Sequence, residues 1–390
     1  MVDMTRRVNH ILFALLSSAI RGTNLSENER MLYSPKVLED LLKIGQKYDI
    51  THLIILALQQ NGLFSPEDRE YSKIIFKVLY RYEQQNQEYK NLCEALEAEQ
   101  IPFIPLKGSV IRKYYPEAWM RTSCDIDILV HPEDLDRTLT YLKQNLQYIE
   151  RARGTHDILL FSPLGIHVEI HFDLVEEGRA NNAIEVLRSV WEDVSLRENS
   201  EYWYEMSDEF FYFYHIAHMA KHFESGGCGI RPFMDLWILD HIEGANQSGR
   251  DELLQKGDLL RFADTVRTLS KVWFDGTEAD NLSLQLQAFL LNGGAYGSSE
   301  NKVALQQTKK GGRFGYVLSR VFIPIAKLKR YYPILDKYPW MMPFMQIRRW
   351  FMLLRPDVAQ MAKKELETNR NIEKSHADEM NIFLHDVGLK

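Results

Sequence analysis

The stretch Asp125-Ile-Asp-Ile-Leu-Val130 places two carboxylates inside an otherwise apolar segment. Side chains alternate along a β-strand, so Asp125 and Asp127 would share one face, about 7 Å apart. Unpaired charges in an apolar strand are costly, and two neighbouring carboxylates favour a cation between them. Hard divalent ions such as Mg²⁺ bind carboxylate oxygens together with substrate phosphates. The stretch therefore predicts a strand that carries a pair of metal ligands.

Other segments around this stretch also have the patterns of strands and helices. Strands are expected at 101–106, 158–161 and 166–172, and Ser162-Pro-Leu-Gly165 predicts a turn that joins the last two as a hairpin. Apolar residues recur at helical spacing from 5 to 99 and again from 182 onward. The individual helices expected after the first strand are 109–115, 132–145, 208–223, 232–242 and 250–272, with a glycine-rich break at 293–299.

These patterns predict an α+β protein in which a small mixed-sheet core is flanked by N-terminal and C-terminal helical domains. The expected division is an N-terminal helical region at 1–99, an α/β core at 100–180, a helical domain that closes the cleft at 181–300, and a basic, aromatic-rich helical region at 301–390.

A phosphate-binding turn is expected before the acidic strand. Leu106-Lys-Gly-Ser109 combines a strand end, a glycine and a helix start, an arrangement in which backbone N–H groups bind phosphate; Lys107 adds a positive charge. Glu169 lies on the strand His167-Val-Glu-Ile-His171 and would supply a third carboxylate if the two strands are neighbours; Asp173 is the alternative. Together these features indicate metal-assisted phosphoryl or nucleotidyl transfer.

Each feature also has a structural interpretation. An Asp-x-Asp pair can be the solvent face of an edge strand, and Lys-Gly-Ser can be an ordinary helix start. His167 and His171 can be hydrogen-bonded strand histidines. The order of the features, a phosphate-type turn followed by two acids in an apolar strand, favours the functional interpretation.

The chain resembles a bacterial nucleotidyltransferase family of the DNA polymerase β-like superfamily. The resemblance extends beyond the core to the helical His215-Ile-Ala-His-Met-Ala-Lys-His222 pattern and to a C-terminal motif that starts at Tyr332. The motifs of the core that carry it are Leu106-Lys-Gly108, Tyr115-Pro116, Arg121, Asp125-Ile-Asp-Ile-Leu-Val130 and Val168-Glu-Ile-His171, followed by Arg231 and Asp235.

The resemblance implies transfer of a nucleoside monophosphate from a nucleoside triphosphate to a hydroxyl or similar acceptor, with release of pyrophosphate. The acceptor would be a small molecule, a peptide or a protein. The implied roles are catalysis and binding of two Mg²⁺ or Mn²⁺ ions by Asp125, Asp127 and Glu169, nucleotide binding by Lys107, Gly108, Ser109 and Arg121, and candidate substrate contacts at His171, Lys221, Arg231 and Asp235. The rival hypothesis is a catalytically silent nucleotide-binding or interaction module that keeps the fold.

Three histidines of the helical region, His215, His218 and His222, fall on one helix face. They could bind zinc, but no cysteine or clustered carboxylate completes a tetrahedral set. We therefore expect core histidines that are hydrogen-bonded to Asp235.

The net charge of -7 is unevenly distributed. Residues 302–370 hold 15 Lys and Arg against 4 Asp and Glu, a local charge of +11, which leaves -18 for the rest. Aromatic residues alternate with these basic ones between Tyr331 and Arg355, a composition that suits single-stranded nucleic acid or a membrane surface. We instead expect the aromatics to pack in a core and the basic rim to pair with the acidic body, since that body would repel a long nucleic acid.

Cysteine usage and hydropathy bear on the compartment. Cys93, Cys124 and Cys228 are far apart and have no metal-binding spacing, so no disulfide framework is expected and a reducing cytoplasm fits. No apolar run is long enough to predict a membrane span.

Overall fold

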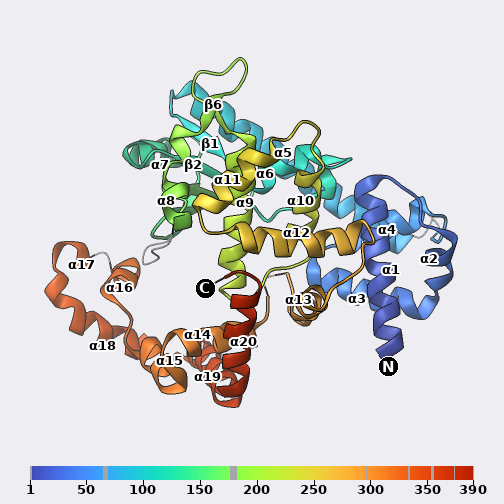
Figure 1. Cartoon of the computed structure of the whole chain (residues 1–390). Coiled ribbons are helices and arrows are strands. Elements are labelled where there is room, and N and C mark those ends of the chain that lie inside the picture. Colours follow the sequence, from blue (N-terminus) through green and yellow to red (C-terminus); the bar gives the residue numbers. More distant parts are fainter. Residues whose placement is uncertain are drawn as a thin grey trace. The chain divides into compact units, whose positions relative to one another are not determined.

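The computed structural model describes residues 2–64, 69–175, 182–295, 297–332, 334–352, 355–372 and 374–389 (Figure 1). The chain divides into two compact units. The first comprises Met1–His218 and Gly229–Gln287, and the second comprises Met219–Cys228 and Ala288–Lys390. The fourfold division expected from the sequence stays a prediction.

A mixed five-stranded sheet forms the centre of the first unit, with the strand order β1-β2-β5-β4-β3. β2 and β5 are parallel, and the other neighbouring pairs are antiparallel. The predicted hairpin, β4 and β5, is confirmed, and so is the α+β class. The strands are β1 (Phe103–Pro105), β2 (Asp125–Val130), β3 (Ile149–Arg153), β4 (Asp157–Phe161) and β5 (His167–His171).

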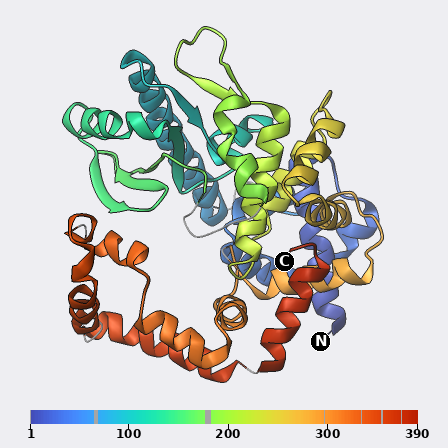
Figure 2. The ribbon, with the colours of Figure 1, turned by 60° about the vertical axis from the view of Figure 1, so that its left-hand side comes forward.

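The two faces of this sheet differ in chemistry. Helices α5 (Arg69–Ala98) and α7 (Leu135–Gln144) pack on the apolar face, on one side of the strands in Figure 2. Their buried partners on the sheet are Ile126, Ile128, Val130, Ile158, Leu160, Val168 and Ile170. Because alternate residues point the other way, the opposite face carries the side chains of the acidic residues of β2 and β5.

Along the chain, helices come before, between and after the strands of this sheet. Those before the sheet are α1 (Val2–Arg21), α2 (Glu27–Leu32), α3 (Pro35–Tyr48) and α4 (Thr51–Gln60). Those between β1 and β3 are α6 (Gly108–Ile111), η1 (Arg112–Tyr114), η2 (Ala118–Met120), η3 (Pro132–Asp134) and α7. Those after the sheet are α8 (Asn182–Arg188), η4 (Val190–Glu192), α9 (Asp208–Phe223), α10 (Arg231–Asp240), α11 (Gln247–Lys256), α12 (Leu260–Phe274) and α13 (Asn281–Asn292).

Three features of the first unit differ from the expectations. β3 and the two-stranded sheet of β6 (Val194–Leu196) and β7 (Tyr204–Met206) were not expected, because these strands are short and mostly exposed. The single helix expected at 250–272 is two helices, α11 and α12. Helix α11 ends before Gly257 and Asp258, and Asp258 has a left-handed backbone conformation with φ 58°.

The second unit is helical in its described parts. Its later elements are α14 (Ser299–Lys309), α15 (Gly312–Val321), α16 (Ile325–Tyr331), α17 (Ile334–Lys337), η5 (Pro339–Met341), α18 (Met342–Met352), α19 (Pro356–Asn371) and α20 (Lys374–Asp386). The described glycine-rich residues between α13 and α14 are not helical, as expected.

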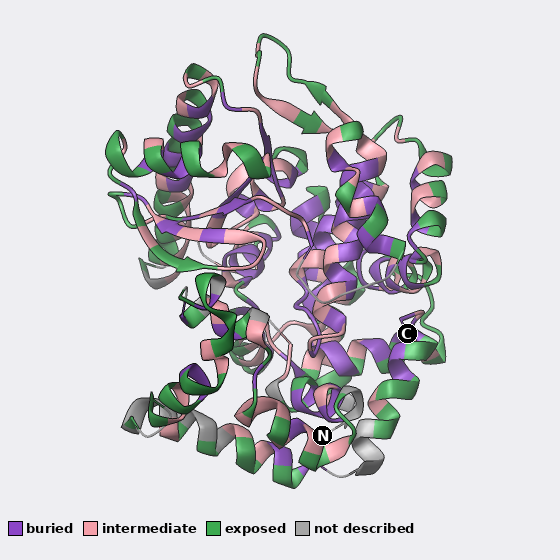
Figure 3. Cartoon of the chain, turned by 90° about the vertical axis from the view of Figure 1, so that its left-hand side faces the viewer, coloured by how far each residue is buried: buried purple, intermediate pink, exposed green. Residues whose placement is uncertain are grey.

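The expectation that the aromatics of this unit pack in a core is wrong for most of them. Tyr332 is buried, but most of the other aromatic side chains of this unit are exposed. Figure 3 colours exposed residues green, and they are frequent in the described helices. A buried cluster of only a few residues around Leu328 and Leu335 is too small to cover them. The exposed aromatics are Tyr331, Tyr338, Trp340, Phe344 and Phe351.

Two further observations concern the cysteines and the helices of the described residues. Cys93, Cys124 and Cys228 are free thiols. Within the described ranges, no helix combines the length and the apolar character that a membrane crossing requires.

Candidate functional site

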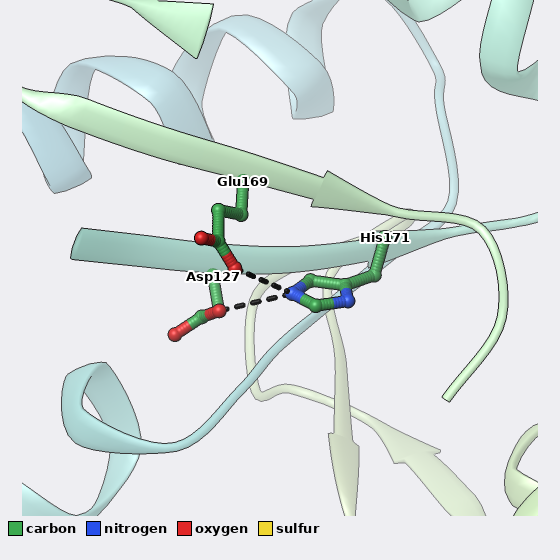
Figure 4. Close-up of side chains that lie close together, drawn as sticks. All are labelled: Asp127, Glu169 and His171. Carbon is green, nitrogen blue, oxygen red and sulfur yellow. Dashed lines mark hydrogen bonds and ion pairs between the residues drawn. The ribbon is translucent and has the colours of Figure 1, made fainter. Parts of the chain in front are cut away.

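Three side chains from adjacent parallel strands meet on the polar face of the sheet. β2 pairs with β5 so that Asp127 is opposite Glu169, and His171 follows on the same face two residues later. The Nε2 atom of His171 lies 2.9 Å from Oδ1 of Asp127 and 3.4 Å from Oε2 of Glu169. Figure 4 shows both interactions ending at the same ring nitrogen. The predicted approach of Glu169 to the acidic strand is thus confirmed.

Lys107 brings a positive charge to this cluster from the turn before α6. Its Nζ atom lies 2.7 Å from Oδ1 of Asp127, so one carboxylate oxygen interacts with both Lys107 and His171. Among the described residues, no hydrogen bond or ion pair involves the other oxygen, Oδ2. Asp127 therefore keeps one acceptor atom available to a ligand.

The cluster is buried, and its charges stabilise one another. Burial alone would raise the pKa of Asp127, but Lys107 and His171 outweigh it and hold that pKa well below its ordinary value. Burial disfavours the charged form of Lys107, yet Asp127 raises its pKa above the usual range. The pKa of His171 is raised in the same way: the two carboxylates overcome the effect of burial. The structure thus favours an ionised carboxylate between two cations.

Asp125 is on the same strand but has a different partner. The hydroxyl of Ser123 lies 2.8 Å from Oδ1 of Asp125 and equally close to its backbone carbonyl. Within the described chain, Asp125 is not part of the group whose ligand atoms lie within 4.8 Å of one another; that group is Asp127, Glu169 and His171. A Cβ on Gly108 would come within 3.3 Å of the Ser123 hydroxyl, so a larger residue there would require Ser123 to shift by a few tenths of an ångström.

Arg121 forms a buried ion pair with a helix distant in sequence. Its Nε and Nη2 atoms each lie 2.8 Å from a different oxygen of Asp235, on α10, and the hydroxyl of Tyr115 donates to the same carboxylate at 2.7 Å. Burial would raise the pKa of Asp235, but Arg121 holds it below its ordinary value. Tyr115, Arg121 and Asp235 therefore connect α10 to the core.

The remaining candidates are not members of the acidic cluster. Arg231 pairs with Asp49 at 2.8 Å, Lys221 belongs to the second unit, and Asp173 accepts a hydrogen bond from the backbone N–H of Val175 at 2.9 Å. Ser109 lines a separate cavity, and its buried hydroxyl has no hydrogen-bond partner in the described chain.

The expected hydrogen bond between the histidines of α9 and Asp235 is wrong for His215. Its ring Nε2 lies 2.9 Å from the carbonyl oxygen of Pro232, whereas Arg121 and Tyr115 occupy the carboxylate of Asp235. The carboxylate pairs with an arginine because a guanidinium forms two parallel hydrogen bonds with it. Burial lowers the pKa of His215, which favours its neutral form.

The residues present fit a divalent cation. Two carboxylates and an imidazole nitrogen, all within 4.8 Å of one another, form a mixed oxygen and nitrogen donor set. Carboxylates suit Mg²⁺ and Mn²⁺, and imidazole extends the range to Zn²⁺ and related ions. The positive charge that Lys107 and a protonated His171 supply in the metal-free protein is charge that a cation would supply when bound.

The comparisons assign the chain to the nucleotidyltransferases. A model of the family described as uncharacterised nucleotidyltransferase matches residues 35–275, more than half of the chain and all five strands of the central sheet. The chain belongs to this family. No curated protein and no solved structure matches it.

The sequence patterns gave too little weight to two residues in or beside the acidic cluster, His171 and Tyr214. His171 was treated mainly as a strand histidine, although the same alternation that selected Glu169 puts it on the polar face. Tyr214 of α9 was not considered. Burial raises its pKa, against the effect of nearby Lys107, so its hydroxyl group is neutral beside the cluster. Its only sequence signal is its place directly before His215.

Proposed function

We propose that this protein is a metal-dependent nucleotidyltransferase that moves a nucleoside monophosphate from a nucleoside triphosphate to a hydroxyl acceptor. The observation that carries the proposal is the meeting of Asp127, Glu169 and His171 on adjacent parallel strands, next to Lys107, in a member of a nucleotidyltransferase family. The DNA polymerase β-like superfamily, a bacterial origin and the use of two ions belong to the same proposal.

In this proposal Asp127, Glu169 and His171 hold a divalent cation, and Asp125 assists from the same face of β2. Such a cation neutralises triphosphate charge and lowers the pKa of the acceptor hydroxyl. The ammonium of Lys107 attracts the phosphates, and the N–H groups of the following turn point toward them. We leave Ser109 out of the phosphate contacts because its hydroxyl is buried and the residue lines another cavity.

Glu169 is assigned to the acceptor hydroxyl. Its side chain is 26% exposed, against 3% for Asp127, so an acceptor has access to Glu169. A carboxylate within reach of the hydroxyl can take its proton as the oxygen attacks the α-phosphate and pyrophosphate leaves. Asp173 is excluded from the role in this proposal since its carboxylate caps the backbone at Val175. Arg121 is proposed as a positioning residue, because Asp235 occupies its guanidinium.

The test needs a readout that does not depend on the unknown acceptor. Mn²⁺ binding can be followed by the loss of the free-ion signal in electron paramagnetic resonance, with and without ATP. We expect the wild type to bind Mn²⁺ and Asp127→Asn to lose this binding, whereas the matched control Asp173→Asn keeps it. Label transfer from each α-labelled nucleotide to a cell extract then identifies the acceptor. Metal-independent nucleotide binding without transfer would support the silent module instead.

A further inference from the structure

A cavity of about 560 Å³ lies between α5, the α6–η1 segment and the start of α9. This volume is within the usual range for small-molecule sites. Among the described residues, its lining includes Ser109, Arg112 and Trp203 but neither Lys107 nor any member of the acidic cluster. It therefore shares no lining residue with the proposed metal site.

In three residues that line this cavity, polar side-chain atoms are buried without a hydrogen-bond partner in the described chain. They are Oγ of Ser109, Nη2 of Arg112 and Nε1 of Trp203. Buried polar groups in folded proteins are normally satisfied, and each exception calls for a cause such as a missing ligand. The arginine and tryptophan atoms can only donate, and the serine hydroxyl can donate as well. A group that fits here must accept hydrogen bonds.

The charge at this cavity points to the sign of the ligand. Arg112 is 6% exposed, and its Nε atom donates to the carbonyl of Gly108 at 3.1 Å. No carboxylate of the described chain forms an ion pair with it. Burial lowers its pKa, and the nearby charge of Arg121 lowers it further. A buried cation without a counter-ion is unfavourable, and a bound anion would compensate it.

Aromatic rings form the walls. Tyr82 lies under the guanidinium of Arg112, with 5.6 Å from its ring centre to the Cζ atom. Tyr89 meets Trp203 edge to face at 5.9 Å, and Phe211 closes the side at α9. Such walls favour a flat apolar body, since offset and edge-to-face ring contacts add to the burial of apolar area.

We infer that this cavity is a second ligand site, which binds a small organic anion with a planar ring and holds its anionic group between Arg112, Trp203 and Ser109. The rim residues do not select the charge, because three exposed cations are balanced by three acids. The cations are Lys90, Lys113 and Arg197, and the acids are exposed Glu94 and Glu205 and half-buried Asp208. The site is distinct from the nucleotide and metal site of the proposed function and does not depend on it.

The experiment compares two probes of the same shape by isothermal titration calorimetry of the full chain: 2-naphthoate, an anion, and 2-naphthamide, its neutral analogue. We expect 2-naphthoate to bind at least about tenfold more tightly, because hydrogen bonds to a charged group contribute about 1.5–3 kcal/mol. Equal affinities, or no binding of 2-naphthoate, would overturn the inference.

Variants locate the binding. Arg112→Met should weaken 2-naphthoate by about tenfold or more and leave 2-naphthamide nearly unchanged. The matched control Lys113→Met removes an exposed cation from the same rim and should change neither affinity. Trp203→Phe keeps an aromatic ring in the wall of the cavity and removes one hydrogen-bond donor. It should weaken the binding of 2-naphthoate several-fold. This variant provides the test if Arg112→Met does not fold. Unchanged 2-naphthoate affinity in both variants would contradict the assignment.

Competition separates this site from the nucleotide site. We expect 2-naphthoate to bind with the same affinity when the protein is saturated with Mn²⁺ and ATP. Displacement of 2-naphthoate by ATP would show one shared site and overturn the second site. Loss of Mn²⁺ binding in Asp127→Asn tests the proposed function alone, because Asp127 does not line this cavity.

Discussion

Lys107 and Arg112 are two cations on one short segment, and their surroundings differ. The ammonium of Lys107 lies 2.7 Å from a buried carboxylate, whereas the buried guanidinium of Arg112 has one nitrogen without a partner. The first region contains its own counter-charge, so its charges are compensated before any ligand arrives. The second region lacks a hydrogen-bond acceptor for this buried nitrogen in the described chain. The ion pair of Lys107 can contribute both to stability and to chemistry. The unpaired charge of Arg112 instead indicates that an anionic ligand binds there.

The largest expected effect is the loss of turnover in Asp127→Asn, which changes the carboxylate that pairs with Lys107. The change keeps the side-chain volume but removes the charge that Lys107 and His171 share. We expect turnover to fall by about 10³-fold or more, equivalent to about 4 kcal/mol of transition-state stabilisation. The measurement is label transfer at saturating Mn²⁺, with circular dichroism to verify folding. Wild-type turnover in a folded variant would contradict the metal assignment.

A second compensated pair, Arg121 and Asp235, tests whether buried charge also holds the helices. Asp235→Asn leaves Arg121 buried without its counter-ion and should lower the free energy of unfolding by about 3–5 kcal/mol near neutral pH. Asp173→Asn, at a half-buried carboxylate that accepts a hydrogen bond from the backbone N–H of Val175, is the matched control and should change it little. Urea unfolding followed by tryptophan fluorescence measures both.

The same pair has a defined pH dependence. The pKa of Asp235 is lower in the folded protein than its unfolded value of about 3.9. The stabilisation is therefore fully present above that unfolded value and is lost as the pH falls through the folded pKa. The difference in unfolding free energy between the wild type and Asp235→Asn should narrow below about pH 4. A constant difference down to about pH 3 would show that the pair does not titrate as proposed.

A smaller effect is expected for Glu169→Gln. If Glu169 takes the proton of the acceptor, turnover should fall by about 10²-fold while nucleotide affinity stays nearly constant, because proton transfer affects the transition state. Steady-state kinetics beside Asp173→Asn is the measurement. A severe loss only in the Asp173 variant would move the role to that residue.

The smallest effects compare the two cations directly. Lys107→Met removes a partner of buried Asp127 and should destabilise the protein by about 1–3 kcal/mol. Arg112→Met removes an uncompensated charge and should leave the free energy of unfolding within about 1 kcal/mol of the wild type. Parallel urea titrations measure both. Equal losses would show that Arg112 is compensated in solution.

The sequence was most informative where the chemistry follows a local repeat. Alternation along β2 and β5 predicted which acids share a face, and the hairpin turn predicted how β4 meets β5. β3 has no comparable pattern, since four of its five residues are exposed. The contact between Arg121 and Asp235 joins positions 114 residues apart, and no local pattern predicts the partner of a buried charge. The cavity at Arg112 is missed for the same reason.

The backbone of Lys107 adds one further consequence. Its dihedral angles, φ 47° and ψ -122°, lie in a region that residues with a Cβ atom rarely occupy and that glycine enters freely. Holding such a residue there requires conformational energy of order 1–3 kcal/mol. By backbone preference alone the position would be a glycine, and Lys107→Gly would relax it. The lysine is therefore kept against the local preference of the chain, and the backbone strain that a glycine would relieve is offset by the ion pair between Lys107 and Asp127.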